Sequence, residues 1–248
     1  MTLRAIGRSW SSEGGKMKNR CKKLVKFSYK KLKTILKILS KRNGGEPPAM
    51  ESNDIIFKFD PEKTVQVAAM FLKLHGKSMK YLGLLKLIYM ADRLSLERIN
   101  QPLTGDNYVS MEYGPVLSRV YDFIKGSQIS GINLWKTYIV NGQENHTVKL
   151  ISDPGTGELS RREEKIIKEI YEECGNYDRF DLVNITHEFP EWQDPKKLNP
   201  PRKVTPINNI KILKVIGKTE NEINEIKETV ERELYLDETF NNANTRSR

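Results

Sequence analysis

One segment constrains the fold more than any other, because it is apolar on almost every side. From Tyr81 to Ala91 the only charged residue is Lys86. A helix that is apolar all round packs in the middle of a domain rather than at its surface. Charged residues return after Ala91, and Pro102 and Gly105 are typical of residues that end a helix. We therefore expect a buried central helix with the rest of the domain packed around it.

The charged residues of this helix suggest local pairing. Arg93 and Glu97 are four residues apart, so we expect them to face each other across one helical turn. Two interpretations of Lys86 remain open. Its long side chain reaches the surface past apolar neighbours, or its ammonium group pairs within a polar cluster. The candidate partners in that cluster are Asp92, Glu112 and Arg119.

Capping signals divide the rest of the chain into further helices. Asp60 followed by Pro61 predicts a helix start. Residues 160–163 and 219–222 each match a capping box, in which a serine or threonine precedes a glutamate by three positions. The other predicted helices span residues 115–129, 180–189 and 207–216, and residues 239–248 are expected to form a frayed tail.

A single β-hairpin is the main exception to this helical pattern. Residues 134–140 and 146–151 are expected to be strands, joined at Asn141-Gly142, because both residues tolerate positive φ. The predicted fold class is therefore mainly α: a compact helical domain around a buried central helix, with one small hairpin. Helices followed by a hairpin also suit a winged-helix arrangement, which indicates DNA binding only weakly.

Charge divides the chain into three parts. Residues 1–49 have a net charge of +12 and the remainder a net charge of −2. We expect residues 1–49 to be a partly disordered basic arm with an amphipathic helix over residues 18–42, residues 50–217 to be the helical domain, and residues 218–248 to be a final helix and tail. The basic arm, rather than the domain, accounts for the overall charge of +10.

The basic segment 18–42 has three interpretations. Its lysines could bind DNA, an anionic surface or an acidic groove of a partner. It could instead be an extra helix packed on the body with its lysines solvated. Alternatively it is not normally translated, and Met50 is the native start.

The sequence contains none of the common motifs that identify an enzyme reaction. It contains no P-loop, dinucleotide fingerprint, GxSxG elbow or HExxH pair. The two cysteines, Cys21 and Cys174, are too few for a disulfide scaffold and have no metal-ligand spacing. We therefore expect no enzyme activity, no cofactor and no metal, and a reducing cytoplasm as the compartment.

Four short motifs stand out along the chain: KLIYMADR at residues 86–93, PLTGD at 102–106, YGPV at 113–116 and THEFPEW at 186–192. Together they resemble the Panacea domain, the antitoxin family typified by SocA-like proteins. The resemblance extends over about residues 57–217. It implies an antitoxin that neutralises a toxin, encoded beside it, by direct protein–protein contact. A DNA-binding autoregulator and an adaptor that delivers a bound client to a protease remain as alternatives.

The residues expected to bind the partner lie in or beside these motifs. Tyr108, Tyr113 and Arg119 are the candidate anchors, although each tyrosine could instead pack in the core with its hydroxyl bonded. His187 could bridge a helix end and Trp192 could fill the core. The full predicted set is Lys86, Asp92, Arg93, Tyr108, Glu112, Tyr113, Arg119, His187 and Trp192.

Overall fold

The computed structural model describes residues 54–142 and 146–246, with side chains described up to residue 240. The basic arm, its predicted helix at 18–42 and both alternative start residues lie outside this part. The helices are α2 (Pro61–Leu74), α3 (Tyr81–Ile99), α4 (Ser118–Lys125), α5 (Ile132–Tyr138), α6 (Arg161–Cys174), α7 (Arg179–His187), η1 (Pro195–Lys197), α8 (Asn209–Val215) and α9 (Glu220–Arg246). The strands are β1 (Ser78–Lys80), β2 (Tyr108–Met111), β3 (Gly114–Leu117), β4 (Ile139–Asn141), β5 (Thr147–Leu150) and β6 (Thr205–Pro206).

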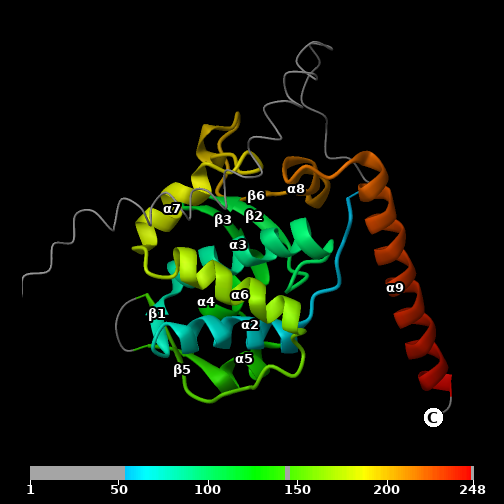
Figure 1. The fold of residues 1–248 in the computed structure, drawn as a ribbon, viewed down its shortest axis with the longest axis horizontal. Helices are drawn as coiled ribbons and strands as arrows, with labels where there is room; N and C mark the ends of the chain where they lie inside the picture. Colours follow the sequence, from blue (N-terminus) through cyan, green and yellow to red (C-terminus); the bar gives the residue numbers. More distant parts are fainter. Residues whose placement is uncertain (1–53, 143–145, 247–248) are drawn as a thin grey trace, which may run out of the picture.

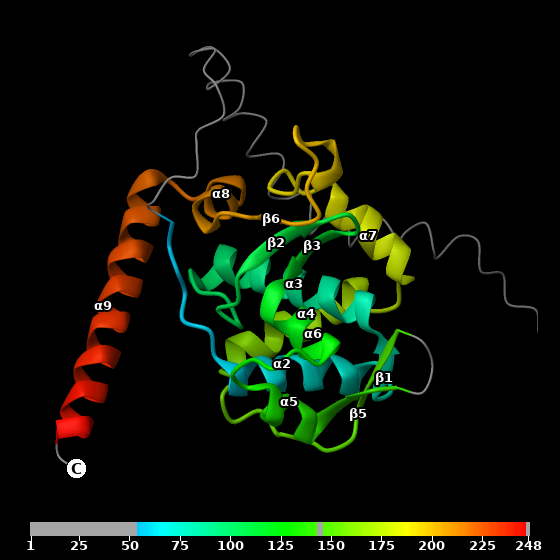
Figure 2. The same ribbon diagram turned by 180° about the vertical axis from the view of Figure 1, so that it is seen from behind.

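Helix α3 is the centre of the domain, as the sequence predicts. Every residue from Gly83 to Leu96 is buried. Figures 1 and 2 show α3 in the middle of the body, and it contacts α2, α6, α7 and β3. It ends at Asn100, whose φ of 62° is left-handed, a conformation that asparagine tolerates. The mainly helical fold class is confirmed.

The predicted hairpin belongs to a three-stranded antiparallel sheet in the order β1-β5-β4. Its first strand is shorter than predicted, because residues 132–138 form helix α5 and the strand starts at Ile139. Trp135 is buried on this helix, and its ring centroid lies 5.4 Å from that of Phe123. Packing against Phe123 outweighs the strand-like pattern of the sequence.

A second antiparallel sheet, in the order β3-β2-β6, was not predicted. Pro115, the expected first residue of a helix, instead lies in β3, an edge strand where a missing N–H is tolerated. The helix starts later, at Ser118, because the Asp106 carboxylate accepts hydrogen bonds from the amides of Arg119 and Val120, at 3.1 and 3.0 Å. A side chain from the preceding turn thus sets the start of α4.

The other helix starts agree with the predicted capping signals. Asp60 accepts a bond from the Lys63 amide, and both capping boxes form, at Ser160–Glu163 and Thr219–Glu222. The tail predicted from residue 239 is helical as far as Arg246. Figures 1 and 2 show α9 at the edge of the body, beside the extended segment that leads into α2. In the part that the structure describes, no helix combines the length and the apolar character needed to cross a membrane.

Candidate functional site

Asp92 joins the central helix to the turn that follows it. Its carboxylate, which is fully buried, accepts bonds from the Leu103 and Thr104 amides, the Thr104 hydroxyl at 2.6 Å and the Tyr108 hydroxyl at 2.9 Å. Burial raises the pKa of Asp92 to about 7, although these hydrogen bonds oppose the rise. The arrangement fixes the turn and the start of β2, so Asp92 and Tyr108 act as supports inside the domain.

Arg93 pairs with a carboxylate far away in the sequence. Its Nε donates to Glu191 at 2.7 Å, and the Tyr89 hydroxyl donates to the same oxygen at 3.1 Å. The guanidinium also lies 4.6 Å from the centroid of the Phe189 ring. Arg93 makes its ion pair with Glu191, in the segment after α7, rather than with Glu97, although the charge of Glu97 still acts on the guanidinium.

Lys86 fits neither of its two interpretations. Its ammonium group is fully buried and donates to the Pro115 carbonyl at 2.7 Å, so it neither reaches solvent nor pairs with a carboxylate. Burial lowers the pKa of Lys86 to about 7. Gly114 makes this approach possible: a Cβ on it would lie 2.8 Å from Lys86 Nζ and 2.9 Å from Thr186 Oγ1, and its φ is +92°. These contacts hold β3 against α3 and α7.

His187 and Trp192 form one rigid unit beside the hairpin of β2 and β3. Their rings stack with centroids 3.9 Å apart and planes 7° from parallel. Trp192 Nε1 donates to the Met111 carbonyl at 3.1 Å, which fixes the unit to β2. Burial lowers the pKa of the His187 imidazole, and the nearby charge of Lys86 lowers it further. The imidazole is therefore held mainly neutral at pH 7.

We use the term tip face for the surface that this unit supports: Glu112, Tyr113, His187, Trp192 and Lys196. Tyr113 is 53% exposed at the turn between β2 and β3. Glu112 pairs with Lys196 at 2.6 Å. His187 and Trp192 are half-buried behind them. The tip face therefore presents one exposed aromatic ring and one surface ion pair on a rigid base.

The nine predicted residues thus divide into three groups. Glu112, Tyr113, His187 and Trp192 come together at the tip face. Arg119 lies at the other end of β3, with its guanidinium 4.8 Å from the Phe59 ring centroid. The other four, Lys86, Asp92, Arg93 and Tyr108, are buried and cannot touch a partner in this conformation. Two contributors, Glu191 and Lys196, were not predicted; Glu191 lies inside the THEFPEW motif, which was its only signal.

One comparison with known proteins finds a similar family. Residues 84–193 match the family model described as "Antitoxin SocA-like, Panacea domain". This part of the chain is therefore similar to the Panacea domain, and it includes every residue of the tip face except Lys196. A search of the curated proteins finds no match, and neither does a search of the solved structures. The family supports a role related to toxin–antitoxin systems.

Proposed function

We propose that this protein neutralises a toxin by binding it directly through the tip face, with no reaction of its own. The toxin would be a protein encoded beside it, and both would act in the cytoplasm. The observation that carries the proposal is the exposed ring of Tyr113, at a turn whose base is fixed by the His187–Trp192 stack. A rigid exposed aromatic side chain is a typical anchor of a protein interface.

The buried contacts beneath the tip face support binding through it. The buried contacts of Lys86, Asp92 and Arg93 all hold the elements that frame it: β3, the turn before β2, and the segment after α7. Such a base loses little conformational entropy when a partner binds, which favours affinity. A specific interface of about 1,600 Å² in total would also reach beyond the tip face onto its surroundings.

Co-expression tests this proposal. The protein, produced together with the product of the adjacent gene, should restore growth that the adjacent gene alone arrests, and the two should co-purify. A Tyr113→Ala variant should lose both effects while keeping its thermal unfolding midpoint, because the side chain is exposed. Growth restored without any complex would contradict direct binding.

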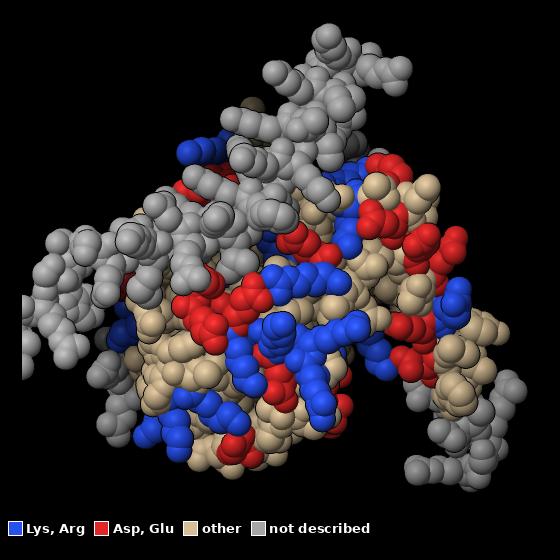
Figure 3. Space-filling view, in the orientation of Figure 1, with Lys and Arg blue, Asp and Glu red and all other residues tan. Residues whose placement is uncertain are grey.

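The two alternative functions stay predictions. No specific contact in the described part of the chain favours a DNA-binding autoregulator or a protease adaptor over toxin binding. Mixed positive and negative side chains cover the face seen in Figure 3, with Lys and Arg gathered over the middle of the body. A gel shift at several salt concentrations would test DNA binding, because phosphate contacts weaken steeply with salt.

A further inference from the structure

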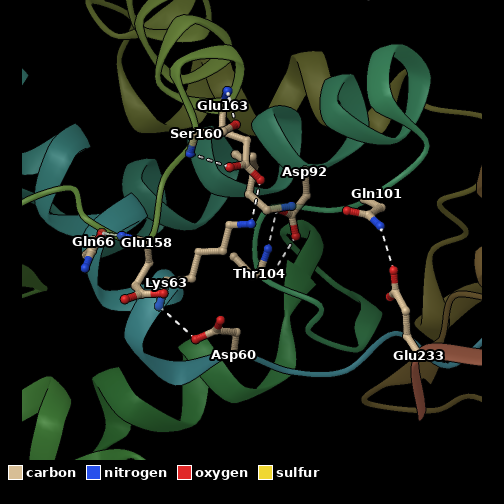
Figure 4. A network of polar contacts seen from close by, with 11 residues as sticks. Asp60, Lys63, Gln66, Asp92, Gln101, Thr104, Glu158, Ser160, Glu163 and Glu233 are labelled. Carbon is tan, nitrogen blue, oxygen red and sulfur yellow. Dashed lines mark hydrogen bonds and ion pairs between the residues drawn. The ribbon is translucent and has the colours of Figure 1, made fainter. Parts of the chain in front are cut away.

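A second feature of the molecule lies away from the tip face, between α9 and the body. A groove of about 410 Å³ is lined by residues 57–63, by residues 101–105 and by Glu233 of α9. Two contacts join α9 to the body beside the groove. Gln101 donates to Glu233 at 3.3 Å, and Lys58 pairs with Asp237. Figure 4 shows Gln101 and Glu233 facing each other on one side of Thr104, and Asp60 and Lys63 on the other side.

One wall of the groove is an extended segment in which only some of the backbone N–H and C=O groups are hydrogen-bonded. The Asp60 amide donates to the Thr104 carbonyl at 3.1 Å, and the segment packs tightly on Gly105, where a Cβ would lie 2.0 Å from the Lys58 carbonyl oxygen. The main-chain groups of Phe57 and Phe59 make no hydrogen bond to any other residue that the structure describes. Phe57 and Phe59 are two positions apart in an extended segment, so their N–H and C=O groups lie on the same side and can pair with an added β-strand.

The groove has more negative than positive charge available to a partner. Its two lysines, Lys58 and Lys63, are each paired with a carboxylate, of Asp237 and Glu163 respectively. Among the described residues, Glu62 has no ion-pair partner and Glu233 is bonded only to a neutral amide. Acidic side chains also gather along α9 in Figure 3.

Apolar and aromatic surface lies beside these carboxylates. Phe57, Phe59 and Pro102 line the groove. Phe59 already holds the Arg119 guanidinium 4.8 Å from its ring centroid, which shows that this ring suits a cation. Phe240 is 66% exposed and follows Glu233 by seven residues, so it lies on the same face of α9 about two turns further on.

We propose that this groove binds an extended segment of a protein partner that carries arginine or lysine side chains. The segment would pair with the main chain of Phe57 and Phe59, and its cationic side chains would meet Glu62 and Glu233. This contact is separate from the tip face. It could therefore fail while toxin binding at the tip face stands, or stand while that fails.

A labelled nonapeptide of alternating arginine and valine is the probe, and fluorescence anisotropy with the full chain is the measurement. The groove variant Glu62→Gln/Glu233→Gln should bind about tenfold more weakly than the unmodified chain, because both cationic contacts are lost. The control variant Glu172→Gln/Glu228→Gln makes the same change of charge at two exposed positions outside the groove, and it should bind within about twofold of the unmodified chain. Circular dichroism should be the same for all three.

A second probe tests the main-chain pairing. The same peptide with alternate amides methylated keeps its charges but cannot pair as a strand, so it should also bind about tenfold more weakly. Equal losses of peptide affinity in the groove variant and the control variant would show general attraction to an acidic protein and would overturn the proposal. So would undiminished binding of the methylated peptide, or no binding of the first peptide to the unmodified chain.

Discussion

The imidazole of His187 lies flat on the indole of Trp192, with ring centroids 3.9 Å apart, and the indole N–H is bonded to the Met111 carbonyl. This pair fixes the end of α7 against β2. The turn that carries Tyr113 is therefore held in place by residues more than seventy positions away in the sequence. The rigidity of the tip face comes from tertiary contacts rather than from the turn itself.

The stacked pair gives an optical signal for protonation. Burial is the main reason that the pKa of His187 falls below its ordinary value of 6.5. Tryptophan fluorescence should therefore change as the imidazole becomes charged, with a midpoint below pH 6.5. A Trp192→Phe variant should lack this transition although the other two tryptophans, Trp10 and Trp135, remain. A midpoint above pH 6.5 would contradict the buried environment of the ring.

Asp92 should be among the most sensitive positions for stability. Asparagine has the same shape, but an NH2 donor in place of Oδ2 removes the acceptor that the Thr104 and Tyr108 hydroxyls share inside the core. The Asp92→Asn change should lower the free energy of unfolding by about 2 kcal/mol, measured by urea denaturation. Glu172→Gln, at an exposed position, should change it by less than about 0.5 kcal/mol.

The Arg93–Glu191 pair should show strong coupling. Arg93→Met alone leaves the Glu191 carboxylate buried without its ion-pair partner, and should cost about 3–5 kcal/mol. The double variant Arg93→Met/Glu191→Leu removes both charges and should recover most of that loss. A double-mutant cycle from chemical denaturation measures this coupling. Additive losses would mean that the two side chains act independently.

The sequence contains enough information to predict α3, because a segment without a polar face has few other places to pack. The partner of Arg93 could not be predicted in the same way. Glu97 is the carboxylate one turn further along the helix, but burial of the guanidinium selects Glu191, almost a hundred residues further on. Local spacing cannot reveal such a pairing. The position of Pro115 could not be predicted from local sequence either. A proline suits the start of a helix, but Pro115 lies in the edge strand β3.

The tip face was only partly foreseeable for the same reason. Its four predicted members belong to motifs that are separate in the sequence, and only the packing of α7 against β3 brings them together. The interior positions of Lys86 and Tyr108 depend on elements that the sequence did not predict, namely strands β2 and β3. An isolated polar residue in a motif can support a surface as readily as it can form one.

Lys86 should make stability depend on pH in a defined window. Burial lowers its pKa from 10.5 to about 7, so between these values the unfolded chain holds a proton that the folded chain lacks. Its contribution to the free energy of unfolding should therefore rise with pH from about 7 to about 10.5, by at most about 1.4 kcal/mol per pH unit.

The matched variant for this test is Lys86→Met, which keeps the length of the side chain but does not titrate. The difference in unfolding free energy between the unmodified chain and the variant, measured at pH 7.5 and 9.5, should shift in favour of the unmodified chain at the higher pH. A difference that stays constant would mean that the lysine keeps its proton inside the fold.

The most direct test of toxin binding at the tip face is the dissociation constant for the adjacent gene product, measured by calorimetry with the full chain. The account predicts that Tyr113→Ala weakens binding by about tenfold or more. Tyr235→Ala, which removes a tyrosine that is 67% exposed on α9, should leave it unchanged. Equal affinities for the unmodified chain and Tyr113→Ala, with the complex intact, would contradict the account.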